Sequence, residues 1–340
     1  MQSRQKISII VMVVVLAIGA VVIALDWEKA RQVISEANWF ITIIALFFTA
    51  VSFFCLSCAF LVVSRLFEIN IPRPKLLQIG YVSLALDNVL ALSGFGGLSL
   101  RIVLMRQYRV KISRVIAASI YESYFDGLVL LVLLLIGLVF LVLSHTVEGG
   151  AAVGILLSAG ITAFFIILAT ISIFIARVRW PLMRGINSIS KFIARRDIMG
   201  SLSTFDSALS FGWSEVRRRP LMAASILGLI VAYWAFMLLV LWLCFYALGG
   251  KIKPDVLITG FTIGISVGNL SMVPGGFGVQ EASMAGVYAL LGVPLTQAVL
   301  AVILFRIVYD IIPYVASFSL YRSVLRQPKL EGKGATPRST

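Results

Sequence analysis

Six long apolar runs constrain this chain more than any other feature of its sequence. A helix needs about 20 consecutive apolar residues to cross the hydrocarbon core of a bilayer, and a soluble domain has no use for six such runs. The sequence therefore predicts an all-α polytopic membrane protein. The runs are Ile7–Leu25, Trp39–Val63, Val115–Leu143, Ala151–Ala176, Leu221–Leu248 and Val293–Leu320.

The distribution of basic residues predicts the orientation of the chain. The net charge is +14, but 24 of the 29 Lys and Arg residues fall in segments 1–6, 64–75, 97–114, 177–220 and 321–340. The opposite loops 26–38, 144–150 and 249–255 hold four. This bias places both termini in the cytoplasm of a multi-pass protein of the cell (inner or cytoplasmic) membrane. The basic excess therefore indicates topology and weak attraction to anionic phospholipid at the cytoplasmic face, and not a nucleic-acid partner.

Two polar, glycine-rich breaks interrupt the apolar pattern at matched places. The first is Asn88–Gly97 and the second is Asn269–Gly278, and their asparagines are 181 positions apart. The flanking charges place them at opposite membrane faces. We expect about six full spans plus two re-entrant or broken helices in an inverted repeat, as in many secondary transporters. An alternative with eight full spans stays open.

The domain organisation expected from these patterns is simple. Residues 1–320 form a single transmembrane domain with repeat halves of roughly 1–150 and 151–320. Arg4 and Lys6 precede the first run, 7–25, which reads as an uncleaved first helix. The basic cytoplasmic loop 177–220 has the pattern of an interfacial amphipathic helix, and the tail 321–340 is expected to be disordered.

The breaks contain residues suited to irregular backbone. Glycine adopts angles that other residues resist, and proline stops a helix. A broken helix leaves amide groups that can hold an anion or a polar headgroup. The alternative is that the glycines only allow close helix packing. The candidate residues in the breaks are Asn88, Gly94, Gly97, Asn269, Pro274, Gly275, Gly276 and Gly278.

Six ionisable residues lie at membrane depth, where a charge costs roughly 2.5–3.5 kcal/mol. They are Asp87, Glu122, Asp126, Glu281, Arg306 and Asp310. Two pairs, Glu122 with Asp126 and Arg306 with Asp310, have the four-residue spacing that shares one helix face. The faces meet if a pseudo-twofold axis relates the halves, and Arg306 then neutralises part of the acidic cluster. Arg101 follows the first break and either attracts a phosphate headgroup or anchors the interface. A static ion-pair network is the structural alternative for the cluster.

Metal and cofactor chemistry is not expected. Cys55 and Cys58 form a C-x-x-C inside an apolar run, and His145 is the only histidine. A zinc site needs several such ligands together. The expected metal and cofactor content is therefore none.

The second break resembles the transmembrane family of lysylphosphatidylglycerol synthase, which is flippase-like. The residues that carry the resemblance are Pro274–Glu281, Leu291–Pro294, Leu304–Arg306 and Pro313. In the first half, Leu98 replaces an acidic residue of the family pattern and Ser123 replaces an arginine. These departures count against a first-half ion pair of the family type. The departures also suggest a substrate other than an aminoacyl lipid.

The resemblance implies movement of lipids or lipid-linked molecules between leaflets. The leading hypothesis is a translocase that passes a polar headgroup through a central polar cavity. Alternatives are an accessory subunit that recruits a lipid- or envelope-modifying enzyme, and a membrane-embedded transferase. No soluble transferase domain is expected, and synthesis of a lysyl lipid by this chain is therefore not expected either. The expected partner is a membrane lipid or lipid-linked substrate, and a homo-oligomer is compatible with the sequence. The candidate translocation residues are Asn88, Gly94, Gly97, Arg101, Glu122, Asp126, Asn269, Pro274, Gly275, Gly276, Gly278, Glu281, Arg306 and Asp310.

Overall fold

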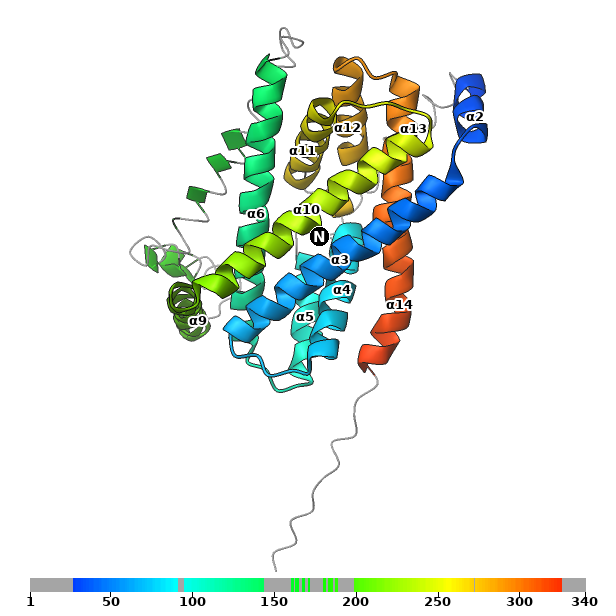
Figure 1. Cartoon of the computed structure of the whole chain (residues 1–340). Helices are drawn as coiled ribbons and strands as arrows, with labels where there is room; N and C mark the ends of the chain where they lie inside the picture. Colours follow the sequence, from blue (N-terminus) through cyan, green and yellow to red (C-terminus); the bar gives the residue numbers. More distant parts are fainter. Residues whose placement is uncertain are drawn as a thin grey trace, which may run out of the picture.

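The computed structural model describes residues 27–90, 95–143, 199–271 and 273–325, together with isolated positions between 160 and 188. All regular elements in these residues are helices. Four helical runs are long and apolar enough to cross a membrane (Figure 1). The prediction of an all-α polytopic membrane protein is therefore confirmed. The runs belong to α3 (Trp39–Leu66), α6 (Ile112–Leu143), α10 (Pro220–Ala247) and the continuous series α13 (Leu295–Arg306), η2 (Ile307–Ile311) and α14 (Ile312–Leu325).

Some parts of the predicted layout lie outside the described residues, and others differ in the structure. The predicted span 7–25 lies outside the described residues, and so does 151–176 apart from a few positions. A short helix, α2 (Trp27–Ser35), precedes α3. At the other end α14 continues to Leu325, so the first five residues of the predicted tail are helical.

Each half of the chain places a hairpin of shorter helices between two long ones. The first hairpin is α4 (Arg73–Leu90) with α5 (Phe95–Arg106), and the second is α11 (Pro254–Leu270) with α12 (Val279–Leu290). α5 and α12 have 12 residues each. That is about 18 Å of helix against a hydrocarbon core of about 30 Å, so neither crosses alone. Figure 1 shows the first hairpin in the lower half of the bundle and the second in the upper half.

The two hairpins meet near the middle of the bundle. α4 packs against η1 (Pro274–Gly276), the short 3₁₀ turn that joins α11 to α12. α4 also packs against α14, and α11 packs against α6. Each hairpin therefore contacts a long helix of the other half, which brings the two sequence breaks together.

Three glycines spaced four residues apart bring α11 and α12 into close contact. Small residues at this spacing let membrane helices approach one another. A β-carbon at any of the three positions would collide with a side chain of α12. The contacts are Gly260 with Tyr288, Gly264 with Met284 and Gly268 with Gln280.

Gly260→Ala is expected to destabilise the protein, although alanine is the better helix former. The added methyl group would overlap the ring of Tyr288, which is fully buried and donates a hydrogen bond to the Leu257 carbonyl oxygen at 3.0 Å. Overpacking costs about 1–3 kcal/mol, and the helix propensity of alanine returns about 1 kcal/mol. We therefore expect a net loss on the order of 1 kcal/mol, measured by unfolding in mixed detergent micelles.

Gly286→Ala in α12 is the matched control for this substitution. A β-carbon at Gly286 would meet no atom within 4 Å. The control is therefore expected to be neutral or slightly stabilising. Equal effects of the two substitutions would contradict the proposed role of Gly260 in helix packing.

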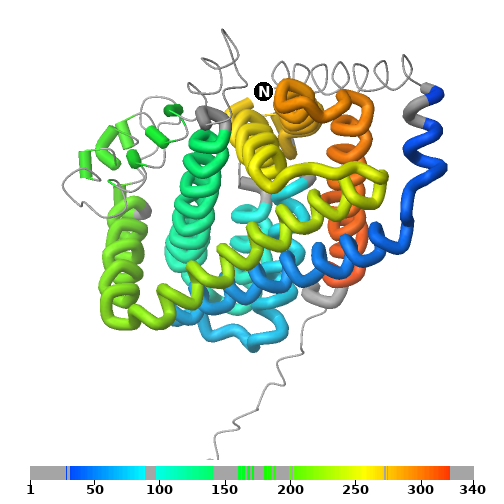
Figure 2. Tube along the Cα trace, turned by 45° about the horizontal axis from the view of Figure 1, so that its top comes forward, coloured from blue at the N-terminus to red at the C-terminus, as the bar shows by residue number. Residues whose placement is uncertain are grey.

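The long helices α3 and α10 run side by side across the hairpins, as both views show (Figures 1 and 2). The Ser52 hydroxyl of α3 donates to the Tyr233 carbonyl oxygen of α10 at 2.9 Å. The Tyr309 hydroxyl of η2 donates to Ser52 at 2.7 Å, and the Tyr309 side chain is fully buried. These hydrogen bonds join α3, α10 and η2 beside the meeting point of the hairpins.

One end of the bundle, called the basic end here, carries the connections at 67–72 and 107–111 and the start of α10. Within the predicted loop 177–220, the structure describes a helix, α9 (Met199–Arg218), that packs against α6 at this end. The Tyr121 hydroxyl of α6 donates to the Leu209 carbonyl oxygen of α9 at 2.9 Å. α9 is therefore joined to the helix that carries Glu122 and Asp126.

Candidate functional site

The second break reverses the chain in a turn that only glycine fits easily. Gly275, Gly276 and Gly278 have φ values of 62°, 63° and 85°. This left-handed region is accessible to glycine at no steric cost, whereas a residue with a Cβ is strained there. The expectation that these glycines supply unusual backbone angles is confirmed.

Arg306 is the centre of an ion-pair network in the second half. Its guanidinium donates to the carboxylates of Glu281 on α12 and Asp310 on η2, the latter at 2.6 Å. It also donates to the Gly275 carbonyl oxygen in the turn and lies over the ring of Phe277, 4.8 Å from the ring centre. The residue is only 7% exposed. One buried side chain therefore joins the turn, α12 and the long helix.

A π-helical turn places Asp310 on the same side as Arg306. Pro313 has no N–H group, so it cannot donate to the Tyr309 carbonyl oxygen. The Ile312 N–H bonds instead to the Ile307 carbonyl oxygen, five residues back. Such π turns occur frequently at functional sites.

The first half contains an ion pair that the departures from the family pattern did not lead us to expect. Arg101 on α5 donates to the carboxylate of Glu122 on α6, and both side chains are buried. Arg101 also donates to the Ser83 hydroxyl at 2.9 Å and lies over the ring of Phe60. The departures counted against such a pair, but it forms because α6 supplies the acid that the position of Leu98 lacks.

The two ion pairs join corresponding elements with their charges exchanged. In the first half the arginine, Arg101, lies on the second hairpin helix and the glutamate, Glu122, on the long helix. In the second half the glutamate, Glu281, lies on the hairpin helix and the arginine, Arg306, on the long helix. Both pairs therefore attach a hairpin to the long helix that follows it.

Protein carboxylates occupy one backbone amide in each break. The Gly97 N–H donates to Asp87 Oδ1 at 2.6 Å. The Gly278 N–H donates to Glu281 Oε2 at 2.5 Å. The expectation that the breaks offer free amides to an anion is therefore wrong for these two glycines.

Two adjoining polar cavities lie where the hairpins meet. The central cavity, of about 580 Å³, is lined by both hairpins and by α6, α10 and η2. The neighbouring cavity, of about 310 Å³, lies against α5 and Arg101. Together they have four acidic and two basic lining side chains. The residues that line both are Asp87, Asn88, Ser123, Asp126 and Tyr233.

Most of the predicted translocation residues come together around these cavities. Gly94 lies outside the described residues, and Pro274 begins the η1 turn. Three more of the predicted residues do not line a cavity but make the hydrogen bonds given above, namely Gly97, Gly278 and Glu281. The predicted residues that line a cavity directly are Asn88, Arg101, Glu122, Asp126, Asn269, Gly275, Gly276, Arg306 and Asp310.

One of these residues keeps a buried atom that lacks a hydrogen-bond partner among the described residues. It is the carboxylate oxygen Oε1 of Glu122, whereas the side chain of Asn88 interacts with Asp310. Buried polar atoms are normally satisfied. An acceptor is therefore available at the cavity wall for a bound polar group.

Several cavity residues were not predicted from the sequence, and α10 supplies the main ones. Trp234 donates its indole N–H to Asp126 at 2.8 Å, and Tyr233 lines both cavities. The sequence signal that could have identified them is the presence of an indole N–H and a phenol hydroxyl inside an otherwise apolar run. Ser123 was read as a departure from a family pattern, but it lies at the junction of the cavities.

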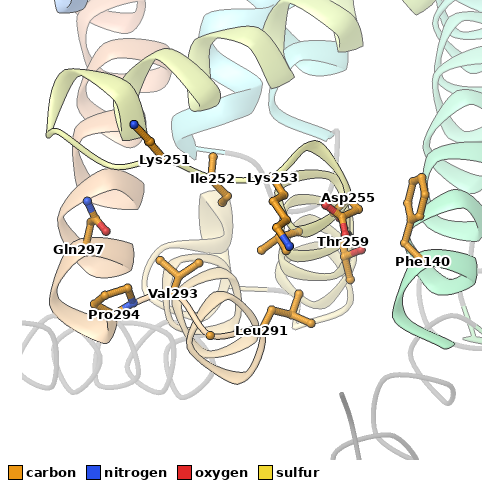
Figure 3. A pocket seen from close by; sticks show the side chains of 12 residues that line it. Phe140, Lys251, Ile252, Lys253, Asp255, Thr259, Leu291, Val293, Pro294 and Gln297 are labelled. Atoms are coloured by element: carbon orange, nitrogen blue, oxygen red, sulfur yellow. Dashed lines mark hydrogen bonds between the residues drawn. The ribbon is translucent and has the colours of Figure 1, made fainter. Parts of the chain in front are cut away.

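A third cavity, of about 390 Å³, lies at the end opposite to the basic end (Figure 3). It shares no lining residue with the other two. Lys251 and Lys253 outnumber its one acid, Asp255, and Figure 3 shows Lys253 extending toward Leu291. α11 and α13 both begin here without a side-chain cap. The lysines and helix N-termini suit an anionic group.

Within the described part of the chain, no three His, Cys, Asp or Glu side chains are grouped to hold a metal ion. Cys55, Cys58 and Cys244 are free thiols. The chemistry at the cavities is therefore that of carboxylates, guanidinium groups, amides and hydroxyls.

Residues 7–317 match the family described as Lysylphosphatidylglycerol synthase TM region. No curated protein matches the chain. The matched residues include both breaks, both ion pairs and all described cavity residues. The family suspected from the second break is therefore confirmed, and the protein belongs to the family of the lysylphosphatidylglycerol synthase transmembrane region.

Proposed function

We propose that this protein moves a lipid or lipid-linked molecule between the leaflets of its membrane. The observation that carries the proposal is the polar cavity formed where two hairpins meet inside an apolar bundle. Its volume lies within the range of ligand sites, about 300–1,000 Å³. A headgroup would occupy the cavity while its apolar tail stays in lipid. The family name, which refers to a lipid synthase, supports a lipid as the cargo.

The charges favour a headgroup with amine or hydroxyl groups beside a phosphate. Acidic side chains outnumber basic ones in the two inner cavities, so they attract a cation or hydroxyl donors. Lys251 and Lys253 make the third cavity, which shares no lining residue with the inner two, a separate place that suits an anionic group such as a phosphate.

An inverted repeat would let the same site face each leaflet in turn. Trp39 and Pro220, which begin α3 and α10, are 181 positions apart, and so are Arg73 and Pro254, which begin α4 and α11. The hairpins lie in opposite halves of the bundle. With the basic end in the cytoplasm, rocking of one half against the other would alternate access.

Ser123→Phe is expected to reduce lipid transport at least about tenfold, which corresponds to about 1.4 kcal/mol on the barrier. Ser123 lines both inner cavities, so the ring would obstruct their junction. The measurement is translocation of labelled lipid by purified protein in liposomes. Phosphatidylglycerol, an aminoacyl phosphatidylglycerol and a polyprenyl-phosphate sugar are compared.

Val132→Phe is the matched control, because Val132 lies on the same helix with 55% of its surface exposed. It should transport as the wild type does. Absence of transport of all three lipids by well-folded wild-type protein would contradict the proposal. Chemical change of a lipid by the purified protein would instead establish a transferase, and damage confined to charge changes in 177–220 would favour a recruiting subunit.

A further inference from the structure

The corresponding aspartates of the two halves, Asp126 and Asp310, have different partners. Asp126 lies four residues after Glu122 on α6, and Asp310 lies four residues after Arg306 on the other long helix. Asp126 and Asp310 are 184 positions apart, as are Glu122 and Arg306. Asp310 is paired with Arg306 at 2.6 Å. Asp126 has no ion pair with a described residue and accepts a hydrogen bond from the neutral indole of Trp234.

The other acids at this depth are all compensated. Glu122 is paired with Arg101, and Glu281 shares Arg306 with Asp310. Asp87 accepts the Gly97 N–H in the first turn of α5, where the helix dipole favours negative charge. Asp126 is therefore the acid of this described cluster that lacks both a cation and a helix N-terminus.

The surroundings of Asp126 add negative charge to its site. On α6, Glu122 lies one turn away. From α4, α10 and η2, the groups that share its cavities are Asp87, Tyr233 and Asp310, and the two cations that line these cavities, Arg101 and Arg306, are each bound to another carboxylate. An ionised carboxylate in such a place needs a counter-charge.

We propose that Asp126 is a proton-binding site that couples lipid transport to a proton gradient. With the cavity empty, the carboxyl group holds a proton. When a headgroup cation enters, the O–H bond of the carboxyl group breaks, the proton passes to water in the cavity, and the carboxylate pairs with the cation. Proton and cation thus compete for one group, which gives exchange of protons for lipid. This inference rests on the proposed function for the identity of the exchanged cation.

A proton fits this site better than a metal ion. Hard cations take six or more oxygen ligands, whereas Asp126 is faced by an indole N–H donor and lies outside any grouped set of metal ligands among the described residues. The cavity walls at Asp126 also include Leu130, Trp234 and Met237, which offer no oxygen ligand. A single carboxyl group suffices to bind a proton.

The first test is infrared difference spectroscopy of the protein in nanodiscs between acid and alkaline buffer. We expect a protonated carboxyl band that disappears in alkali, is absent from Asp126→Asn and shifts in Asp126→Glu. Asp310→Asn is the matched control and should keep the band. The amide oxygen of Asp126→Asn can still accept from Trp234, so this variant retains that contact. A spectrum unchanged by Asp126→Asn would overturn the inference whether or not transport occurs.

The second test is lipid transport in liposomes of phosphatidylethanolamine and phosphatidylglycerol with an imposed pH gradient. For exchange of one proton per lipid, each pH unit should shift the leaflet ratio of a labelled aminoacyl phosphatidylglycerol by about tenfold. Asp126→Asn should show no shift. If the wild type transports lipid but the pH gradient does not shift the leaflet ratio, proton coupling is contradicted and the translocase proposal stands. A titrating Asp126 without transport of any lipid would overturn the translocase but leave the proton site.

Discussion

Arg306→Gln is expected to lower the free energy of unfolding by about 3–5 kcal/mol and to abolish lipid transport. The substitution leaves Glu281 and Asp310 without their cation, and breaking a buried ion pair leaves an uncompensated charge at that cost. It also removes the hydrogen bond to Gly275, which holds the glycine turn against the long helix. Unfolding in mixed detergent micelles and transport in liposomes measure the two effects.

Two further variants separate charge compensation from general disruption. Arg106→Gln, at an exposed position at the end of α5, should leave stability within about 0.5 kcal/mol of the wild type. A triple variant, Arg306→Gln with Glu281→Gln and Asp310→Asn, removes the buried charges together. It should recover most of the lost stability while transport stays absent. An Arg306→Gln protein as stable as Arg106→Gln would show that the network does not stabilise the fold.

Much of this site was predictable because charge at membrane depth is expensive. Arg306 and Asp310 were placed on one helix face from their four-residue spacing, and the structure joins them. The breaks at 88–97 and 269–278 predicted irregular backbone at the centre, and the turn between α11 and α12 has it. In both cases the bilayer leaves few physical solutions, so local sequence was sufficient.

The contacts that the sequence did not predict depend on the angles between helices. α10 is apolar all around, so its sequence does not show which face meets the cavity, and Trp234 was missed. The pairing of Arg101 with Glu122 joins two helices whose relative rotation no local pattern encodes. The packing of Gly260 against Tyr288 was likewise set by the tertiary fold.

Exchanging the charges of Arg101 and Glu122 is the second substitution with a large expected effect. Arg101→Glu places two carboxylates together on α5 and α6, and Glu122→Arg places two guanidinium groups there. Each single variant should lose about 3–5 kcal/mol of unfolding free energy, because both side chains are buried. The double variant should recover most of this loss. Unfolding of all four proteins in mixed detergent micelles gives the coupling energy as a double-mutant cycle.

Recovery is expected because the second half already has the exchanged order, with Glu281 on the hairpin helix and Arg306 on the long helix. The side chains around Arg101 and Glu122 are also compatible with the exchanged charges. The hydroxyl of Ser119, which accepts from Arg101 at 3.3 Å, can equally donate to a carboxylate at that position, and the Ser83 hydroxyl can do so by giving up its hydrogen bond to the Gly80 carbonyl oxygen. Phe60 would lose its cation–π contact, so recovery should fall short by about 1 kcal/mol. A double variant as unstable as the sum of the singles would mean that each side chain is held by its own surroundings, and that the two halves do not use one exchangeable ion pair.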